Sequence, residues 1–205
     1  APVISISKKG AADIYFSELS SNLNGVKGKI VAGETEVTVS SSLIGEFNVE
    51  NILCAVSIAI SLGIDPLKIQ NGLSHCATVT GRMELFQLPN GSSVIIDYAH
   101  TPDAYNKVLK TISEMKRPNG KMHVLFGCGG DRDKIKRPEM GRIAEKYADR
   151  LFISPDNPRS EKSNDINSEI VRGLSKVNHW LFDDRSVALK EAMAILNQKD
   201  IPNKN

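Results

Sequence analysis

Cysteine, aromatic residues and an excess of charge of one sign are all scarce in this 205-residue sequence. The three cysteines, Cys54, Cys76 and Cys128, are odd in number and form no CxxC pair. This pattern argues against a disulfide framework or a zinc site and favours a reducing compartment. Aromatic residues make up 5% of the chain and the net charge is +2. Base-stacking platforms and a basic surface for nucleic acid are therefore not expected.

The sequence also lacks a long hydrophobic run and the usual nucleotide-binding motifs. The longest apolar run, 52–62, is interrupted by Ser57 and Ser61 and is too short to span a bilayer. No signal peptide precedes it, so we expect a cytoplasmic protein without membrane insertion. There is no GxxxxGK(S/T) loop. Gly127-Cys128-Gly129-Gly130 begins like a dinucleotide-binding fingerprint, but Arg132 stands where its third glycine belongs, so a dehydrogenase is not expected.

Residues 1–84 are predicted to form a β-rich segment followed by two helices. Turn residues separate short runs of β-branched and aromatic residues, which predicts antiparallel hairpins with strands over 3–7, 14–16, 28–31 and 36–40. Ile52, Val56 and Ile60 recur every four positions and predict a helix over 48–62 that Gly63 ends. Asp65-Pro66 then caps and starts a second helix.

From residue 92 onward, apolar strands alternate with helices. Strands are predicted over 93–97, 122–126, 151–153 and 180–182, and helices over 101–115, from 138, over 166–174 and from 184. This alternation implies right-handed crossovers and a mainly parallel sheet, so the predicted fold class is α/β. Residues 1–84 are interpreted as the end of one domain and 85–205 as most of another. The second domain is expected to be incomplete, because four strands are few for such a sheet.

Two segments carry the strongest chemical signal, and each follows a predicted strand, where open α/β sheets bind ligands. The first, 126–133, offers small residues and backbone N–H groups beside Arg132. In the second, Asp156-Asn157-Pro158-Arg159, a guanidinium stands next to a carboxylate and an amide. Because guanidinium groups bind carboxylates and phosphates through paired bonds, a site for a charged small molecule is predicted. The nearby charges Lys134, Lys136 and Arg137 are interpreted as a solvated loop.

Asp97 and His100 follow the strand predicted at 93–97 and have no evident structural role. A carboxylate there can accept bonds from ribose hydroxyls, and a histidine can pack against a base. The competing account is that Asp97 caps a turn.

Two further pairs are candidates. Arg82 falls at the predicted domain junction, where it could meet a phosphate with Glu84 holding it; a surface salt bridge is the alternative. Asn48 and Asn51, three positions apart, share a helix face, although capping of the helix would by itself account for Asn48.

Taken in order, five segments of the chain resemble the Mur ligase family: 45–51, 81–84, 97–102, 127–133 and 156–159. The resemblance implies the end of a central ATPase domain over 1–84 and a Rossmann-like C-terminal domain over 85–205. The family's first domain, its P-loop, its magnesium-binding residues and its last strand are not in this sequence, which is therefore expected to be a fragment.

The Asp156–Arg159 segment resembles the members that add meso-diaminopimelate to UDP-MurNAc-L-Ala-D-Glu in peptidoglycan biosynthesis. The resemblance implies ATP and Mg²⁺ as cofactors, formation of an acyl phosphate, and metal ligands outside this fragment. It assigns to the ATP site Asn48, Asn51, Arg82, Asp97 and His100. It assigns to the meso-diaminopimelate site Arg132, Asp156, Asn157, Pro158 and Arg159. No catalytic residue and no metal ligand is assigned within the chain.

The implied partners are UDP-MurNAc-dipeptide and meso-diaminopimelate, with a monomeric protein, and the fragment alone is expected to be inactive. Two alternatives remain open. One is a ligase like folylpolyglutamate synthetase, against which the Asp156–Arg159 segment argues. The other is a non-catalytic module that binds a nucleotide or an amino acid.

Overall fold

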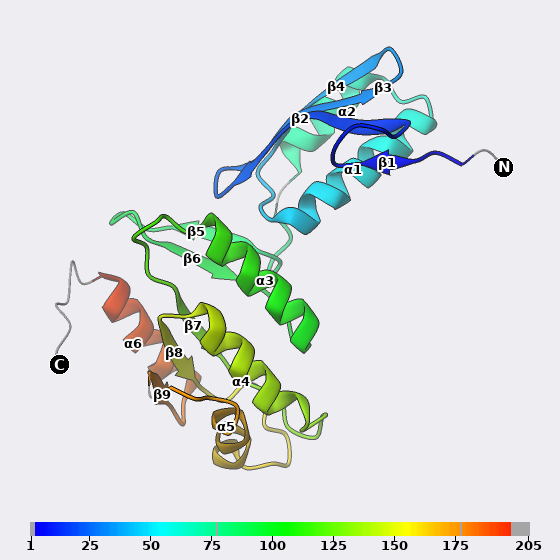
Figure 1. Cartoon of the computed structure of the whole chain (residues 1–205). Helices are drawn as coiled ribbons and strands as arrows, with labels where there is room; N and C mark the ends of the chain where they lie inside the picture. The colour runs from blue at the N-terminus through cyan, green and yellow to red at the C-terminus, as the bar shows by residue number, and fades with distance from the viewer. Residues whose placement is uncertain (1–2, 77, 177, 198–205) are drawn as a thin grey trace. The chain divides into compact units, whose positions relative to one another are not determined.

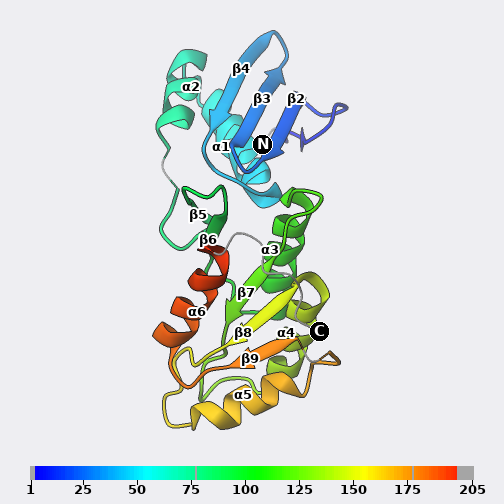
Figure 2. The same cartoon turned by 90° about the vertical axis from the view of Figure 1, so that its left-hand side faces the viewer.

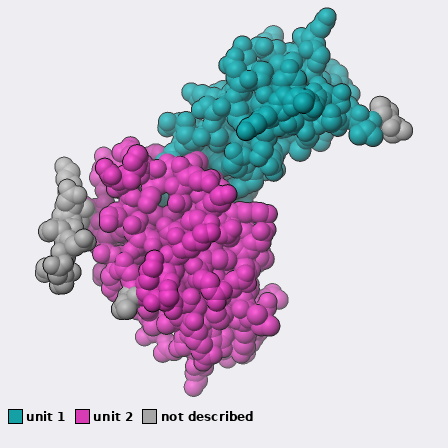
Figure 3. Space-filling model, viewed as in Figure 1, with its two compact units in different colours: residues 1–86, 94–98 teal, residues 87–93, 99–205 magenta. Residues whose placement is uncertain are grey.

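A computed structural model describes residues 3–76, 78–176 and 178–197. Contacts within the chain divide it into two compact units (Figures 1 and 3). Unit 1 comprises residues 1–86 and 94–98, and unit 2 comprises residues 87–93 and 99–205. Within the described ranges, no helix has both the length and the apolar character needed to cross a bilayer.

The sheet of unit 1 contains β1 (Ile6–Ser7), β2 (Ile14–Asn22), β3 (Gly25–Ala32) and β4 (Thr35–Ser41), in that order. The predicted antiparallel pairing is confirmed for β2 with β3 and for β3 with β4. It is wrong for β1, which runs parallel to β2. The Asp13 carboxylate accepts hydrogen bonds from the Ser5 backbone N–H and hydroxyl, so the connecting loop brings the chain back to the start of β1.

The two helices predicted in unit 1 are confirmed as α1 (Glu46–Ser61) and α2 (Pro66–His75). Asp65 caps α2 by accepting from the backbone N–H groups of Leu67 and Lys68. Both helices lie on one face of the sheet (Figure 2). Alternate residues of β4, including Val37 and Val39, are buried beneath them together with Ile52 and Val56 of α1.

In unit 2, the predicted parallel sheet is formed by β7 (His123–Phe126), β8 (Arg150–Ile153) and β9 (His179–Leu181). The helices of this unit are α3 (Pro102–Met115), α4 (Lys136–Tyr147), α5 (Ser163–Val171) and α6 (Arg185–Asn197). Helix α4 lies on one side of the sheet and α6 on the other (Figure 1). The strand–helix alternation that the sequence predicts is therefore confirmed for residues 101–197.

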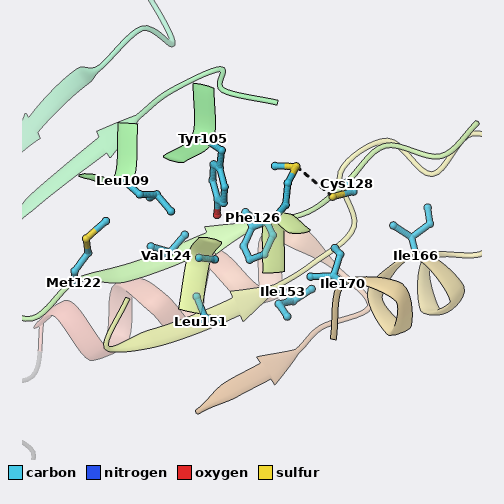
Figure 4. Close-up of a cluster of buried hydrophobic side chains, with 12 residues drawn as sticks. Tyr105, Leu109, Met122, Val124, Phe126, Cys128, Leu151, Ile153, Ile166 and Ile170 are labelled. Atoms are coloured by element: carbon cyan, nitrogen blue, oxygen red, sulfur yellow. Dashed lines mark hydrogen bonds between the residues drawn. The ribbon is translucent and has the colours of Figure 1, made fainter. Parts of the chain in front are cut away.

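The core of unit 2 lies between the sheet and helices α3, α4 and α5 (Figure 4). Alternate strand residues, such as Phe126 of β7 and Ile153 of β8, point into it. Phe152 alternates with Leu151 and Ile153 along β8, so its ring lies on the opposite face of the sheet and stacks with Trp180. Both faces of β8 are thus buried, as expected of a central parallel strand.

One predicted strand has a different partner. The sequence suggested 93–97 as the first strand of the parallel sheet, but β6 (Ser93–Ile96) forms a separate two-stranded sheet with β5 (Glu84–Gln87). The intervening loop is closed by a hydrogen bond from the Leu88 N–H to the Ser92 carbonyl. Strand β5 was not predicted, although the Asn90-Gly91 turn between two apolar runs is a hairpin signal. Local pairing across this turn prevails over pairing with β7.

Candidate functional site

The strongest candidate site is built on two loops of unit 2. Loop A, residues 127–133, follows β7, and loop B, residues 154–161, follows β8. Because β7 and β8 are neighbouring parallel strands with Phe126 opposite Ile153, both loops leave the same edge of the sheet. The prediction that these segments lie at the carboxyl ends of adjacent strands is confirmed.

Glycines allow the two loops to touch through their backbones. A Cβ on Gly127 would lie 2.0 Å from the Ser154 carbonyl oxygen, and one on Gly130 would lie 1.8 Å from the Pro158 carbonyl oxygen. The Gly130 N–H also donates to the Asn157 carbonyl at 2.8 Å. Any side chain at these two positions would push the loops apart, so the glycine run serves loop-to-loop packing.

Side chains add further bonds between the loops. The Asp131 carboxylate accepts from the Ser160 N–H at 3.1 Å and from its hydroxyl at 2.7 Å. These bonds lower the pKa of Asp131. A further bond runs from loop B to loop A, in which Nη1 of Arg159 donates to the Gly130 carbonyl. Asp131 and Arg159 both have positive φ values, 51° and 48°. Such a backbone costs free energy in non-glycine residues and persists only where its surroundings hold it.

Arg137 corrects the interpretation of 134–137 as a solvated loop, because its side chain is 0% exposed. Its guanidinium donates to the carboxylates of Glu161 and Glu169, at 2.8 and 2.7 Å, and to the Gly129 carbonyl at 3.1 Å. These carboxylates raise the pKa of Arg137. The bonds from Arg137, Lys134 and the Asp131 N–H hold the pKa of Glu161 well below its usual range.

Sequence reasoning missed both Arg137 and Glu161. The helix was predicted to begin at Pro138, which left Arg137 in the preceding loop, whereas α4 begins at Lys136. From that start, Arg137 shares a buried face with Met140, Gly141 and Ala144, at spacings of three, four and seven. This spacing is the sequence signal that could have placed Arg137 on the buried face of the helix.

The residues predicted for the amino-acid site are all brought to this one pair of loops. Arg132 lies in loop A and Asp156, Asn157, Pro158 and Arg159 in loop B. Arg132, Asp156, Asn157 and Arg159 are exposed and Pro158 is half-buried. The loops therefore present two guanidinium groups, a carboxylate and an amide to solvent from a backbone held in place on its inner side. Such a surface can bind a small molecule that carries carboxylates.

Asn48 and Asn51 of unit 1 lie in the first turns of α1. Asn48 is buried, and its amide donates to the Ile44 carbonyl at 2.8 Å and accepts from the Asn51 amide at 3.2 Å. Gly45 occupies the N-cap position, so the alternative that Asn48 caps the helix is wrong. The expectation that both asparagines share a face is confirmed, and Asn51 is exposed there.

Segment 81–84 meets residues 97–98 in unit 1. The Asp97 carboxylate accepts from the Met83 N–H at 2.9 Å, and Met83 has a positive φ of 46°. Asp97 therefore has a structural role, contrary to expectation. Glu84 accepts from the Gly81 N–H rather than holding Arg82, whose exposed guanidinium lies 4.8 Å from the centre of the Tyr98 ring.

His100 belongs to unit 2, whereas the other residues predicted for the ATP site belong to unit 1. Its carbonyl accepts from Nζ of Lys136 at 2.9 Å, which ties residue 100 to the start of α4. The grouping of these five residues in one site stays a prediction. Among residues 3–76, 78–176 and 178–197, no cluster of three or more His, Cys, Asp or Glu side chains could hold a metal ion.

Two family models match the chain. One, described as "Mur ligase middle domain", matches residues 1–59, and the other, "Mur ligase, glutamate ligase domain", matches residues 81–201. The chain belongs to the Mur ligase family. The resemblance seen in the five sequence motifs is thereby confirmed over most of the sequence.

Curated relatives carry the name UDP-N-acetylmuramoyl-L-alanyl-D-glutamate–2,6-diaminopimelate ligase. The Trichormus variabilis protein is 42% identical over 188 residues, which are 89% of this chain and 37% of the relative. The Syntrophomonas wolfei protein is 37% identical over 203 residues, 98% of this chain and 41% of the relative. This Mur ligase chain thus spans about two fifths of the length of the curated relatives it matches.

Solved structures agree with the family assignment. A structure of a ligase with the same name is 31% identical, has a TM-score of 0.67, and aligns with 96% of this chain and 40% of its own. The Mycobacterium tuberculosis folylpolyglutamate synthase, complexed with ADP and AMPPCP, has a TM-score of 0.70 at 17% identity over 90% of this chain and 41% of its own. The second likeness shows a shared fold alone.

Proposed function

We propose that this chain is part of an ATP-dependent ligase of the MurE type, which adds meso-diaminopimelate to UDP-MurNAc-L-Ala-D-Glu in peptidoglycan biosynthesis. The relatives named for this reaction support the proposal. The structural observation that carries it is the Asp156–Arg159 segment, held against loop A with its polar side chains exposed.

The amino-acid site consists of Arg132, Asp156, Asn157, Pro158 and Arg159. meso-Diaminopimelate differs from lysine by a carboxylate at the far end of its side chain. One N–H of Arg159 is bound to the Gly130 carbonyl, which fixes the guanidinium, and the remaining N–H groups are on an exposed side chain. A fixed guanidinium suits that carboxylate, because it can donate two parallel hydrogen bonds.

The ATP site comprises Asn48, Asn51, Arg82, Asp97 and His100. The described residues fit this role chemically: Arg82 offers an exposed cation for a phosphate, and the half-buried Asp97 offers a carboxylate for ribose hydroxyls. Bound ATP supplies the phosphoryl group that activates the substrate carboxylate. The residues of this chain bind, orient and neutralise charge, and Mg²⁺ is held by residues outside it.

The domain assignment that accompanies this proposal is a central-domain end over 1–84 and a C-terminal domain over 85–205. The partners are UDP-MurNAc-dipeptide and meso-diaminopimelate. The proposed ligase is a monomeric cytoplasmic protein.

Two substitutions in the complete ligase test the proposal, one in the amino-acid site and one in the ATP site. Arg159→Ala should lower kcat/KM for meso-diaminopimelate by an amount that corresponds to about 2–5 kcal/mol of transition-state binding, since it removes the cation that pairs with the substrate's second carboxylate. The loss for lysine should be much smaller. Arg82→Ala should raise the KM for ATP and leave the preference among amino acids unchanged. Equal losses for both amino acids in Arg159→Ala would contradict the assignment of the selectivity site.

A further inference from the structure

A buried arginine and a glutamate connect loops A and B behind the exposed site. Arg137 donates through both terminal nitrogens to the two carboxylate oxygens of Glu161, at 2.8 and 3.0 Å. The Arg137 side chain is 0% exposed and that of Glu161 is 13% exposed. A two-bond pair of this kind fixes the angle as well as the distance between its partners.

Each member of the pair also binds the backbone of loop A. Arg137 donates to the Gly129 carbonyl at 3.1 Å, and Glu161 accepts from the Asp131 N–H at 2.6 Å. Between these two contacts lies Gly130, whose carbonyl accepts from Nη1 of Arg159. The carbonyl that holds the guanidinium of Arg159 is thus flanked on both sides by residues bound to the buried pair.

We propose that Arg137 and Glu161 are positioning residues that set the orientation of the Arg159 guanidinium through the backbone of residues 129–131. That the guanidinium then selects meso-diaminopimelate rests on the function proposed above. Replacing a buried ion pair by apolar side chains of similar size often costs little stability. The two parallel bonds between Arg137 and Glu161 nevertheless fix their relative orientation. Binding sites depend on such support, because a side chain selects a ligand only when its own position is fixed.

Glu169 of α5 offers a matched control. Its carboxylate also binds Nη1 of Arg137, at 2.7 Å, and its side chain is 22% exposed. Glu161 alone of the two accepts a bond from loop A, at the Asp131 N–H. Glu161→Ala and Glu169→Ala therefore each remove one carboxylate from Arg137. Glu161→Ala also removes the bond to the Asp131 N–H, a second bond to Arg137 and the ion pair with Lys134.

Amide hydrogen exchange in the 205-residue chain tests the positioning directly, with no ligand present. In Glu161→Ala, protection of the Gly130 amide, which donates to the Asn157 carbonyl and not to the replaced side chain, should fall about tenfold or more. In Glu169→Ala it should change much less. The Asp149 N–H donates to the Met122 carbonyl just before β8 and β7 begin, at the edge of the sheet opposite loops A and B. Its exchange rate therefore reports loss of stability in the whole unit. Equal loss of protection in both variants, relative to Asp149, would overturn the proposal.

Selectivity in the complete ligase provides a readout that general destabilisation does not move. The ratio of kcat/KM for meso-diaminopimelate to that for lysine should fall in Glu161→Ala and stay near wild type in Glu169→Ala. An unchanged ratio in Glu161→Ala overturns the positioning role if Arg159→Ala does change it. If Arg159→Ala leaves the ratio unchanged too, the proposed function of the site fails, while the exchange result still decides whether the pair orders the loops. Where Glu161→Ala does not fold, Glu161→Gln takes its place in both measurements.

Discussion

Loops A and B of unit 2 and the candidate nucleotide residues of unit 1 hold their polar side chains through different contacts. Between loops A and B, bonded residues such as Gly130 and Arg159 are 29 positions apart in the sequence, and the supporting cation is buried. In unit 1, Asn48 bonds to Ile44, four positions away, and Asp97 bonds to Met83, 14 positions away. Arg82 is exposed and has an aromatic ring beneath it.

This difference separates two kinds of candidate binding surface. Loops A and B are held by many mutual bonds around the buried Arg137, so their exposed side chains start from a fixed backbone. For the candidate nucleotide residues of unit 1, the bonds of Asn48 and Asp97 span four and 14 positions of the sequence. A site that must distinguish two similar amino acids gains from the first arrangement, because selectivity depends on unequal fit rather than on attraction alone.

The largest effect should follow removal of the cation itself. We expect Arg137→Met to lower the free energy of unfolding of unit 2 by about 3 kcal/mol, the lower end for a broken buried pair because both glutamates retain some exposure. Trp180, the single tryptophan and part of β9, allows this to be measured by fluorescence in a urea titration. As a control, Lys110→Met removes the exposed pair with Glu114 and should cost less than about 1 kcal/mol. Equal costs would contradict the distinction between buried and exposed pairs.

A smaller effect should follow from separating the loops through their backbones. Gly130→Ala should destabilise unit 2 by about 1–3 kcal/mol, because its Cβ would overlap the Pro158 carbonyl, which belongs to a held backbone. Gly129→Ala is the adjacent control and should cost less, because its Cβ would lie 3.0 Å from Nη1 of Arg159, the end of a side chain, and would not overlap a backbone carbonyl. The same urea titration measures both variants. A larger loss in the control would show that the loops are not packed as described.

The smallest of these effects should be the dependence of unit 2 on acid. The pKa of Glu161 is lowered in the folded chain by its bonds to Arg137, Lys134 and the Asp131 N–H. Its contribution to stability is therefore complete above its ordinary value of 4.5 and is lost as the pH falls below that value toward the lower folded pKa. The urea midpoint, followed by Trp180 fluorescence from pH 7 to pH 3, should decline less steeply in Glu161→Gln than in wild type.

The exposed Glu191 of α6 supplies the control for this experiment, since Glu191→Gln should follow the wild-type curve. A wild-type slope in Glu161→Gln would mean that the carboxylate is not held by Arg137 in solution.

Much of the fold could be predicted because its signals are local. The Asp65-Pro66 start of α2 and the four-residue repeat of Ile52, Val56 and Ile60 in α1 depend on neighbours within one or two helical turns. Two predictions failed, and each concerned the strand that a segment pairs with or the direction of that pairing. Strand β6 pairs with β5 rather than with β7, and β1 runs parallel to β2. Strand propensity indicates that a segment is extended, but it does not determine which strand the segment pairs with.

For the candidate site, residue types and their order along the chain were enough to point to loops A and B. The ends of strands, runs of small residues and arginines can be recognised in the sequence alone, and they led to the Mur ligase resemblance. The burial of Arg137 was not readable in this way. A charged side chain is ordinarily solvated, and only the folded chain brings Glu161 and Glu169, 24 and 32 positions away, close enough to offset the cost of its desolvation.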